Sequence, residues 1–207
     1  MAKSTHIAFI LDRSGSMSAL WDEVKGGFKG FIEDQKKQGN PKFSLTVFDT
    51  EFTKVYDKVD LADVANNLPE DVFPRGSTAL LDAVGQTVSS IGKAKKVMVV
   101  IFTDGYENSS HEYTKQQIKD LVKDRQDAGW GFLFLGADQD AFAEGSQWGM
   151  QRGQTVSFDS AVAGSSAGSI RLASNTTSSY LYQNKKVDVP DTFTPDQKKS
   201  KKVVAKS

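Results

Sequence analysis

The sequence predicts an α/β fold: a doubly wound, mostly parallel six-stranded sheet with helices on both faces and one antiparallel edge strand. Three continuous apolar runs, Ile7–Leu11, Val97–Phe102 and Phe132–Leu135, are typical of parallel strands that are buried on both faces. Between these runs, apolar residues recur every three to four positions, which indicates helices. Helices that alternate with strands imply crossover connections and therefore a parallel sheet.

The expected helices follow from the positions of their apolar residues. Three sets carry the helical spacing: Leu20, Val24, Phe28, Phe31 and Ile32; Leu80, Leu81, Val84, Val88 and Ile91; and Ile118, Leu121 and Val122. Gly39-Asn40-Pro41 is expected to end the first helix, because glycine and proline commonly follow a helix C-terminus.

A hairpin is expected to supply the antiparallel edge strand. Phe43, Leu45 and Val47 alternate with polar residues, and Phe52 lies in the similar stretch 51–56. The short link Asp49-Thr50-Glu51 joins the two segments, which is typical of a hairpin. We expect this link to face solvent.

The C-terminal part of the chain is expected to hold one more strand and one more helix. Thr155–Phe158 fits a last short strand, and residues 160–182, rich in Ser, Ala, Gly and Thr, keep a helical spacing. A flexible linker is the alternative for residues 160–182. Residues 183–207 are polar and Lys-rich, so we expect a domain over residues 1–182 and a basic, disordered tail.

Composition and charge exclude several function classes. The chain has 207 residues, which fits one domain with an extension, and its lack of cysteine excludes disulfides, thiolate zinc sites and cysteine nucleophiles. The net charge is zero, but residues 185–207 hold seven Lys and three Asp, which leaves 19 basic against 23 acidic residues elsewhere. Binding of nucleic acid is therefore not expected, except through the tail.

No segment is expected to enter a membrane or to direct export. The apolar run at Ile7–Leu11 is too short for the core of a signal peptide. The longest apolar run, Val97–Phe102, is far below the roughly 18 residues that span a bilayer. We therefore expect a cytoplasmic protein with no membrane partner.

Polar side chains follow directly after the first expected strand. Asp12, Ser14 and Ser16 lie at alternate positions on a turn that opens a helix, and Gly15 allows that turn to be tight. In an open α/β sheet, ligands bind beyond the carboxyl ends of the strands. Carboxylates and hydroxyls are hard oxygen ligands that suit Mg²⁺ or Mn²⁺. Taken alone, the same residues could equally form a helix N-cap.

Two further segments are expected at the same edge of the sheet. Gly76-Ser77-Thr78-Ala79-Leu80 opens the second helix and offers the hydroxyl of Thr78. Phe102-Thr103-Asp104-Gly105 ends the central apolar strand and offers the carboxylate of Asp104.

Together, Asp12-x-Ser14-x-Ser16, the Thr78 turn and the Thr-Asp-Gly turn resemble the metal-ion-dependent adhesion site of the von Willebrand factor type A (vWA) domain. The resemblance covers roughly residues 5–160, extends at most to 182, and shows no missing ligand. It implies a Rossmann-like sheet with the strand order 3-2-1-4-5-6, in a protein of bacterial or phage type.

The resemblance also implies the role of each site residue. Ser14 and Ser16 would bind Mg²⁺ directly, and Thr78 directly or through water. Asp12 and Asp104 would hold the metal largely through bound water. The open coordination position would then take an Asp or Glu of a protein partner.

Residues beside the site are candidates for contact with that partner. Arg13 could reach acidic surface near the metal, although a solvent-facing guanidinium is the expected case. Tyr106, two residues after Asp104, is the strongest single candidate. Trp21, Phe73 and Trp148 could add to an apolar collar or pack beneath the loops.

The sequence thus favours a metal-dependent protein-interaction module over two alternatives. The first is a structural subunit of a larger assembly, a homo- or hetero-oligomer or a virion component, in which the metal locks an interface. The second is a metal-dependent hydrolase, which we do not expect, because Gly-x-Ser-x-Gly and P-loop motifs are absent. His6 is expected at the opposite end of the sheet, and His111 in a solvated loop.

Overall fold

The computed structural model describes residues 5–92, 94–137, 141–151, 153–190 and 192–193. They form a seven-stranded sheet in the order β3-β2-β1-β4-β5-β6-β7, in which only the β2–β3 pair is antiparallel. The strands are β1 (Thr5–Asp12), β2 (Lys42–Phe48), β3 (Phe52–Asp60), β4 (Lys96–Thr103), β5 (Gly131–Ala137), β6 (Thr155–Phe158) and β7 (Thr192–Phe193). The structure confirms the expected fold class and adds a seventh strand.

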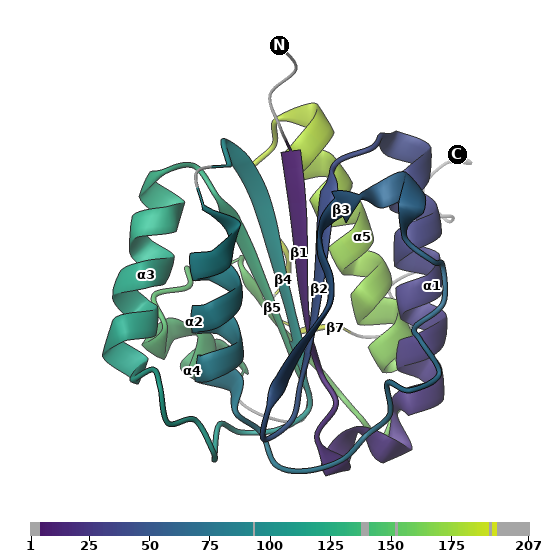
Figure 1. The fold of residues 1–207 in the computed structure, drawn as a ribbon, viewed down its shortest axis with the longest axis vertical. Coiled ribbons are helices and arrows are strands. Elements are labelled where there is room, and N and C mark those ends of the chain that lie inside the picture. The colour runs from purple at the N-terminus through teal and green to yellow at the C-terminus, as the bar shows by residue number, and fades with distance from the viewer. Residues whose placement is uncertain (1–4, 93, 138–140, 152, 191, 194–207) are drawn as a thin grey trace, which may run out of the picture.

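Helices cover both faces of this sheet. They are α1 (Trp21–Gln38), α2 (Leu80–Ile91), α3 (Lys115–Asp127), α4 (Ala141–Gln147) and α5 (Ser165–Gln183), with 3-10 turns η1 (Gly15–Ala19) and η2 (Leu61–Asp63). Helices α1 and α5 lie on one face, and α2, α3 and α4 lie on the other (Figure 1). The sequence did not indicate α4.

The central strands are buried on both faces, which explains their continuous apolar runs. Ile7, Phe9 and Leu11 of β1 pack in the cluster beneath α1 and α5, whereas Ala8 and Ile10 pack in the cluster beneath α2 and α3. The alternation arises because successive side chains of a strand point to opposite faces.

Helix α5 confirms the helix expected within residues 160–182 and excludes the linker alternative. Its small side chains let it lie close to α1, where Gln35 is fully buried. The Gln35 side-chain amide donates to the backbone oxygen of Ser174 at 2.9 Å and to the hydroxyl of Ser178 at 3.0 Å. These bonds satisfy the buried amide nitrogen of Gln35, whereas its Oε1 has no hydrogen-bond partner among the described residues.

The segment after α5 differs from the expected tail up to Phe193. Val189 is 6% exposed and belongs to the core, and its N–H donates to the backbone oxygen of Gly153 at 2.9 Å. Residues Thr192–Phe193 then pair with β6 as β7. Isolated apolar residues in a polar stretch supply this packing, so composition alone did not reveal it. The Lys-rich residues 194–207 lie outside the described residues.

The topology brings the expected site to one end of the sheet. Strand β1 begins at the upper end of the sheet in Figure 1, so the parallel strands end at the lower end. The chain leaves β1 for β2 on one side, and β4 lies on the other side of β1. Such a reversal of strand order leaves a crevice between the loops that follow β1 and β4.

In the described part of the chain, none of the helices combines the length and apolar character that crossing a membrane would require.

The close contact of α1 with α5 can be tested with two neighbouring glycines. A Cβ at Gly27 would lie 2.8 Å from Cδ1 of the buried Ile170 and 3.2 Å from Cα of Ala167, whereas a Cβ at Gly26 would meet nothing within 4 Å. We expect Gly27→Ala to lower the free energy of unfolding by about 1–3 kcal/mol through overpacking. Gly26→Ala should raise it by up to about 1 kcal/mol through helix propensity. Urea titrations measure both, and equal effects would contradict the packing.

Candidate functional site

Loops that are far apart in sequence are joined by backbone hydrogen bonds at the lower end of the sheet. Gly15 N–H donates to Gly76 O at 3.1 Å, and Asn108 N–H donates to Thr78 O at 3.1 Å. Gly76 has a φ of +67°, and a Cβ there would lie 2.8 Å from the hydroxyl oxygen of Thr50, so this turn requires glycine. The bonds fix the position of the Thr78 turn relative to the turns that follow β1 and β4.

The Asp12 carboxylate lies at the centre of this arrangement and is fully buried. Its Oδ1 accepts the N–H of Ser14 at 2.6 Å, and its Oδ2 accepts the hydroxyl of Thr103 at 2.5 Å. Burial raises the pKa of Asp12 to about 6, although the hydrogen bonds from Thr103 and Ser14 act in the opposite direction; the charge of Asp104 adds to the increase. Without a bound cation, the ionised carboxylate is therefore destabilised here.

The expected hydroxyls lie together beside Asp104. The oxygens of Ser14 and Ser16 are 3.0 Å apart, and the Ser16 hydroxyl donates to Asp104 Oδ1 at 2.6 Å. A Cβ placed on Gly105 would lie 3.0 Å from the hydroxyl oxygen of Thr78 and 3.7 Å from that of Ser16. The structure therefore brings together the five side chains that the sequence singled out: Asp12, Ser14, Ser16, Thr78 and Asp104.

This donor set fits a small, hard cation. A hydroxyl that donates its proton to a carboxylate, as Ser16 does to Asp104, keeps its lone pairs for a metal. Within the described residues, no group of three or more His, Cys, Asp or Glu side chains could hold a metal. A cation at this site would instead be held by Ser14, Ser16 and Thr78 hydroxyls, with Asp12 and Asp104 balancing its charge.

Arg13 does not face solvent, which corrects the expectation for this residue. Its side chain is 6% exposed, and its Nε lies 3.0 Å from Oδ2 of Asp49, which also accepts from Arg75 Nε at 2.7 Å. Burial would raise the pKa of Asp49, but the hydrogen bond from Arg75 and the nearby guanidinium charges outweigh it and lower that pKa. Arg13 thus holds the loop after β1 against the turn between β2 and β3. Asp49, expected in solvent, is buried, whereas Glu51 is exposed.

Two of the four aromatic residues considered for a collar lie at the surface. Tyr106 is 63% exposed and Phe73 is 52% exposed, whereas Trp21 and Trp148 are buried in the core. Packing beneath the loops was the alternative for each of them, and it holds for the two tryptophans. Tyr106 and Phe73 remain available to a partner.

Several residues that hold the loops have no role that is predicted from the sequence. Thr103 bonds Asp12, and Asn108 accepts the N–H of Thr78 at 2.9 Å. Glu107 accepts the N–H groups of Leu81 and Ser110 at 2.9 and 2.7 Å. Thr103 directly precedes Asp104 in the motif, which was a usable signal; the partners of Glu107 depend on the path of the loop.

The two histidines lie apart from one another. His6, at the start of β1, is buried and bonded to the hydroxyl of Ser44 at 3.0 Å. Burial, with the charge of Lys58, lowers the pKa of His6 to about 4. His111 is exposed, and its backbone N–H donates to Asp82. His6 therefore lies at the opposite end of β1 from the site, as expected.

Comparison with known proteins finds a matching family for the sequence and similar structures for the fold. Residues 1–156 match the family described as "VWA domain containing CoxE-like protein". No curated protein matches the sequence.

Solved structures share the fold at low sequence identity. The vWF domain of the type V pili tip protein Mfa5 from Porphyromonas gingivalis has a TM-score of 0.65 and 10% identity, covering 92% of this chain and 99% of that one. The PilB minor pilin from Streptococcus sanguinis has a TM-score of 0.64 and 13% identity, and the match covers 88% of this chain and 63% of that one. Proximal thread matrix protein 1 from the mussel byssus has a TM-score of 0.62 and 19% identity, and the match covers 85% of this chain and 45% of that one. The chain thus spans less than two thirds of PilB and under half of the thread protein.

The buried charge of Asp12 leads to a stability prediction. Because the folded pKa of about 6 exceeds the ordinary value of 3.8, the metal-free fold loses stability as the pH rises from about 4 to 6. At about pH 8, Asp12→Asn should leave the free energy of unfolding of the metal-free protein unchanged or raise it by up to about 3 kcal/mol. Thermal unfolding with and without Mg²⁺ measures this, and Mg²⁺ should stabilise only the parent. An unfolded variant would mean that the carboxylate is structurally essential.

The same pKa predicts how metal binding depends on pH. A proton on Asp12 competes with a cation, so Mg²⁺ affinity should fall by up to about tenfold per pH unit below about 6. Calorimetric titration with MgCl₂ at about pH 5 and pH 7.5 measures the change. Equal affinities at the two pH values would contradict the competition between a proton on Asp12 and the cation.

Proposed function

The chain belongs to the family of VWA domain containing CoxE-like proteins, and from this membership we propose that it is a metal-dependent protein-interaction module. Mg²⁺, or Mn²⁺, is held at the lower end of the sheet and binds an Asp or Glu of a protein partner. The observation that carries the proposal is the convergence of three hydroxyls and two carboxylates from three separate loops.

The chemistry of the site favours an acidic ligand. A bound divalent cation supplies a positive centre whose charge three neutral hydroxyls do not offset, so an additional anionic oxygen is attracted to it. A carboxylate bound to a desolvated cation at an interface is a strong, charge-assisted contact. Tyr106, two residues after Asp104, and Phe73, three residues before Gly76, offer exposed apolar surface to a partner.

A non-catalytic role is part of the proposal. Turnover would require a base or nucleophile aligned with the metal. The nearest histidine in sequence to the Thr-Asp-Gly turn, His111, lies in the exposed loop that Asp82 holds through three backbone N–H groups. Proteins of the same fold carry the names of a pilus tip protein, a minor pilin and a thread matrix protein, which supports an interaction role.

These names also favour a second candidate function, a subunit of a larger assembly. In that case the metal would lock an interface between subunits. Size-exclusion chromatography with light scattering, in Mg²⁺ and in EDTA, separates the two. A monomer under both conditions supports the interaction module, and a large oligomer that forms with metal supports the assembly subunit.

Capture of partners in the presence and absence of metal tests the proposed function. We expect the immobilised protein to retain partners from a cell lysate in Mg²⁺ and to release them in EDTA. Asp104→Ala should abolish this capture, because it removes a carboxylate that accepts from Ser16, while the fold remains intact.

Glu51→Ala is the matched control. It removes the same charge at the same end of the sheet, from a side chain that is 80% exposed and outside the donor set. Capture by this variant should equal that of the parent. Partners that remain bound in EDTA, or that both variants lose equally, would contradict the metal-dependent mechanism.

A further inference from the structure

A second concave surface lies at the end of the sheet opposite to the proposed metal site. There β4 and β5 begin and α2, α3 and α5 end, and a hollow of about 680 Å³ opens between them. This volume is within the range of about 300–1,000 Å³ that is typical of ligand pockets. We name it the basal hollow, because it lies where β4 and β5 begin, at the upper end of the sheet in Figure 1. Its floor includes Trp130 and Tyr180.

The basal hollow is strongly basic. Five cationic side chains line it and none of its lining residues is acidic; the cations are Lys95, Lys96, Arg125, Lys185 and Lys186. One role of these cations is to balance the negative ends of α2, α3 and α5. Each helix end carries roughly half a negative charge, so three ends offset only about 1.5 of the five positive charges. A net positive charge therefore remains for a ligand.

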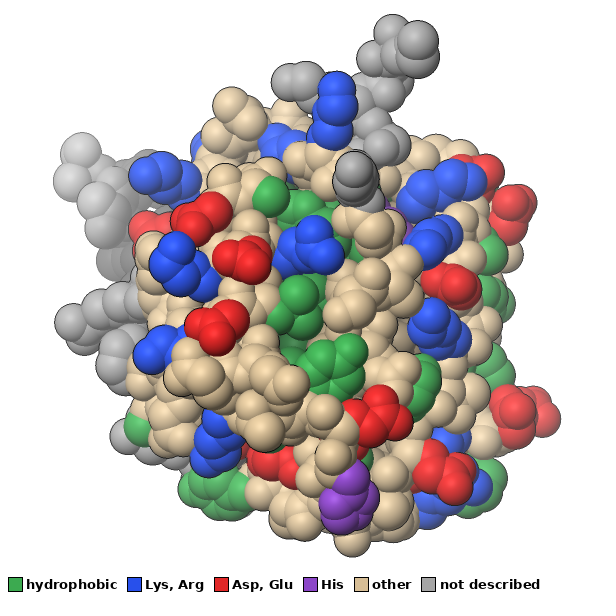
Figure 2. Space-filling model, turned by 60° about the vertical axis from the view of Figure 1, so that its left-hand side comes forward, with side chains coloured by type: hydrophobic (Ala, Val, Ile, Leu, Met, Phe, Trp, Pro, Cys, Tyr) green, Lys and Arg blue, Asp and Glu red, His purple; other side chains and the backbone are tan. Residues whose placement is uncertain are grey.

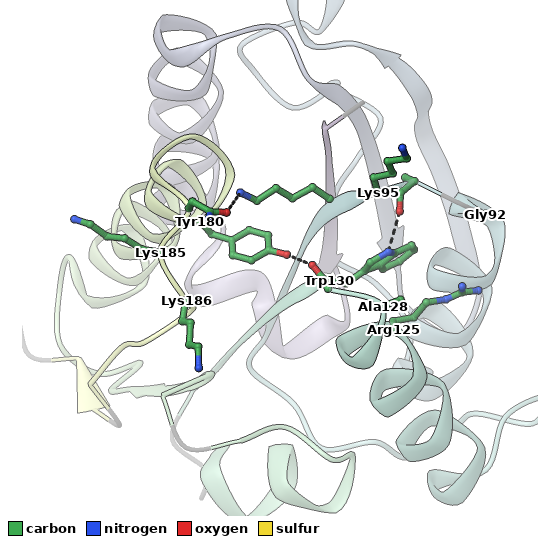
Figure 3. A pocket seen from close by; sticks show the side chains of 12 residues that line it. Gly92, Lys95, Arg125, Ala128, Trp130, Tyr180, Lys185 and Lys186 are labelled. Atoms are coloured by element: carbon green, nitrogen blue, oxygen red, sulfur yellow. Dashed lines mark hydrogen bonds between the residues drawn. The ribbon is translucent and has the colours of Figure 1, made fainter. Parts of the chain in front are cut away.

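Contacts within the hollow fix its floor in place. Lys96 Nζ lies 5.2 Å above the Tyr180 ring and 3.1 Å from Asn184 Oδ1, and the Trp130 indole N–H donates to Ala94 O at 3.1 Å. Lys185 and Lys186 extend on one side of these rings, and Lys95 and Arg125 on the other (Figure 3).

Arg125 also carries an unmet donor. Its guanidinium lies 5.0 Å from the Trp130 ring, and its Nε is buried without a hydrogen-bond partner among the described residues. A ligand in the hollow would meet Arg125 through the charge of its guanidinium, because the Nε itself has no exposed surface.

Neighbouring hollows extend the surface into a groove. A hollow of about 560 Å³ shares Gly129, Trp130, Tyr180 and Lys186 with the basal hollow. Another, of about 420 Å³, shares Lys185 and Lys186. Each of these two neighbouring hollows also has one acidic lining residue, Asp127 in the first and Asp188 in the second, so the excess of basic side chains is greatest in the basal hollow itself. On the face that carries α2 and α3, Lys and Arg side chains, interspersed with Asp and Glu, lie on both sides of a strip of apolar surface (Figure 2). A groove of this kind fits an extended chain better than a compact ion.

The chemistry of the groove selects among anionic ligands. Single-stranded nucleic acid needs exposed aromatic faces for base stacking, but Trp130 is 5% exposed and Lys96 lies over Tyr180. Phosphate groups are bound well at helix N-termini, whereas α2, α3 and α5 present their C-terminal ends here. Carboxylates spaced along a polypeptide match separate lysines without requiring backbone donors.

We propose that this basal groove binds an acidic segment of a partner protein, independently of the metal site. The two sites lie at opposite ends of the same sheet. A chain with both could hold two acidic partners at once, or two parts of one partner, and so act as a bridge. The groove requires no metal, so the proposal stands whether or not the function proposed above is correct.

Binding of a fluorescent oligoglutamate peptide in EDTA tests the proposal, because EDTA removes the contribution of the metal site. We expect anisotropy to show binding that weakens steeply with added salt. Lys185→Glu/Lys186→Glu should weaken it by at least about tenfold, because both side chains line the basal hollow and the change reverses two of its five charges. Asp104→Ala should bind like the parent, which separates this site from the metal site.

Lys25→Glu/Lys29→Glu is the matched control, with the same change in net charge at two exposed positions of α1. Its affinity for the peptide should stay within about twofold of the parent. Circular dichroism should show that both variants fold. Absence of peptide binding in EDTA, or equal losses in the two double variants, would overturn the proposal. So would binding of inorganic polyphosphate without binding of the peptide.

Discussion

The arrangement of the site depends on one buried carboxylate. Asp12 ends β1 and accepts hydrogen bonds from Ser14, in its own loop, and from Thr103, at the end of the neighbouring strand β4. Burial makes the ionised form of Asp12 costly, as its raised pKa indicates, so the negative charge is poorly compensated within the fold. A divalent cation would compensate this charge. The constraint that holds the loops together would therefore also favour the binding of a metal there.

The same architecture gives the molecule two chemically different ends. At the lower end, hydroxyls and carboxylates converge where the parallel strands finish. At the upper end, where α2, α3 and α5 finish, lysines and Arg125 surround a hollow. Helix dipoles contribute to this difference, because all three helices present their negative ends to the basic side chains. We propose an acidic ligand for each end, held through a bound cation at the lower end and through side-chain charge alone at the upper end.

Apolar runs and apolar periodicity predicted most of the helices and strands from the sequence. The runs around Phe9, Val99 and Phe134 are buried on both faces, so their apolar character identified the strands and their order along the chain. The five side chains that converge at the lower end were also readable, because Asp12, Ser14 and Ser16 are local and the other two follow recognisable turns. Contacts between distant residues were not readable. Arg13 was expected in solvent, but it pairs with Asp49, 36 residues away, and a lone Val189 was enough to attach a polar segment to the core.

The most direct test of the central claim is to locate a bound cation. Crystals grown with MnCl₂ and measured near the manganese absorption edge would show each bound Mn²⁺ as an anomalous peak. We expect one strong peak among the hydroxyls of Ser14, Ser16 and Thr78, with Asp12 and Asp104 beside it. Crystals that bind Mn²⁺ elsewhere, or that show no peak between these side chains, would contradict the claim that the buried charge of Asp12 prepares a metal site.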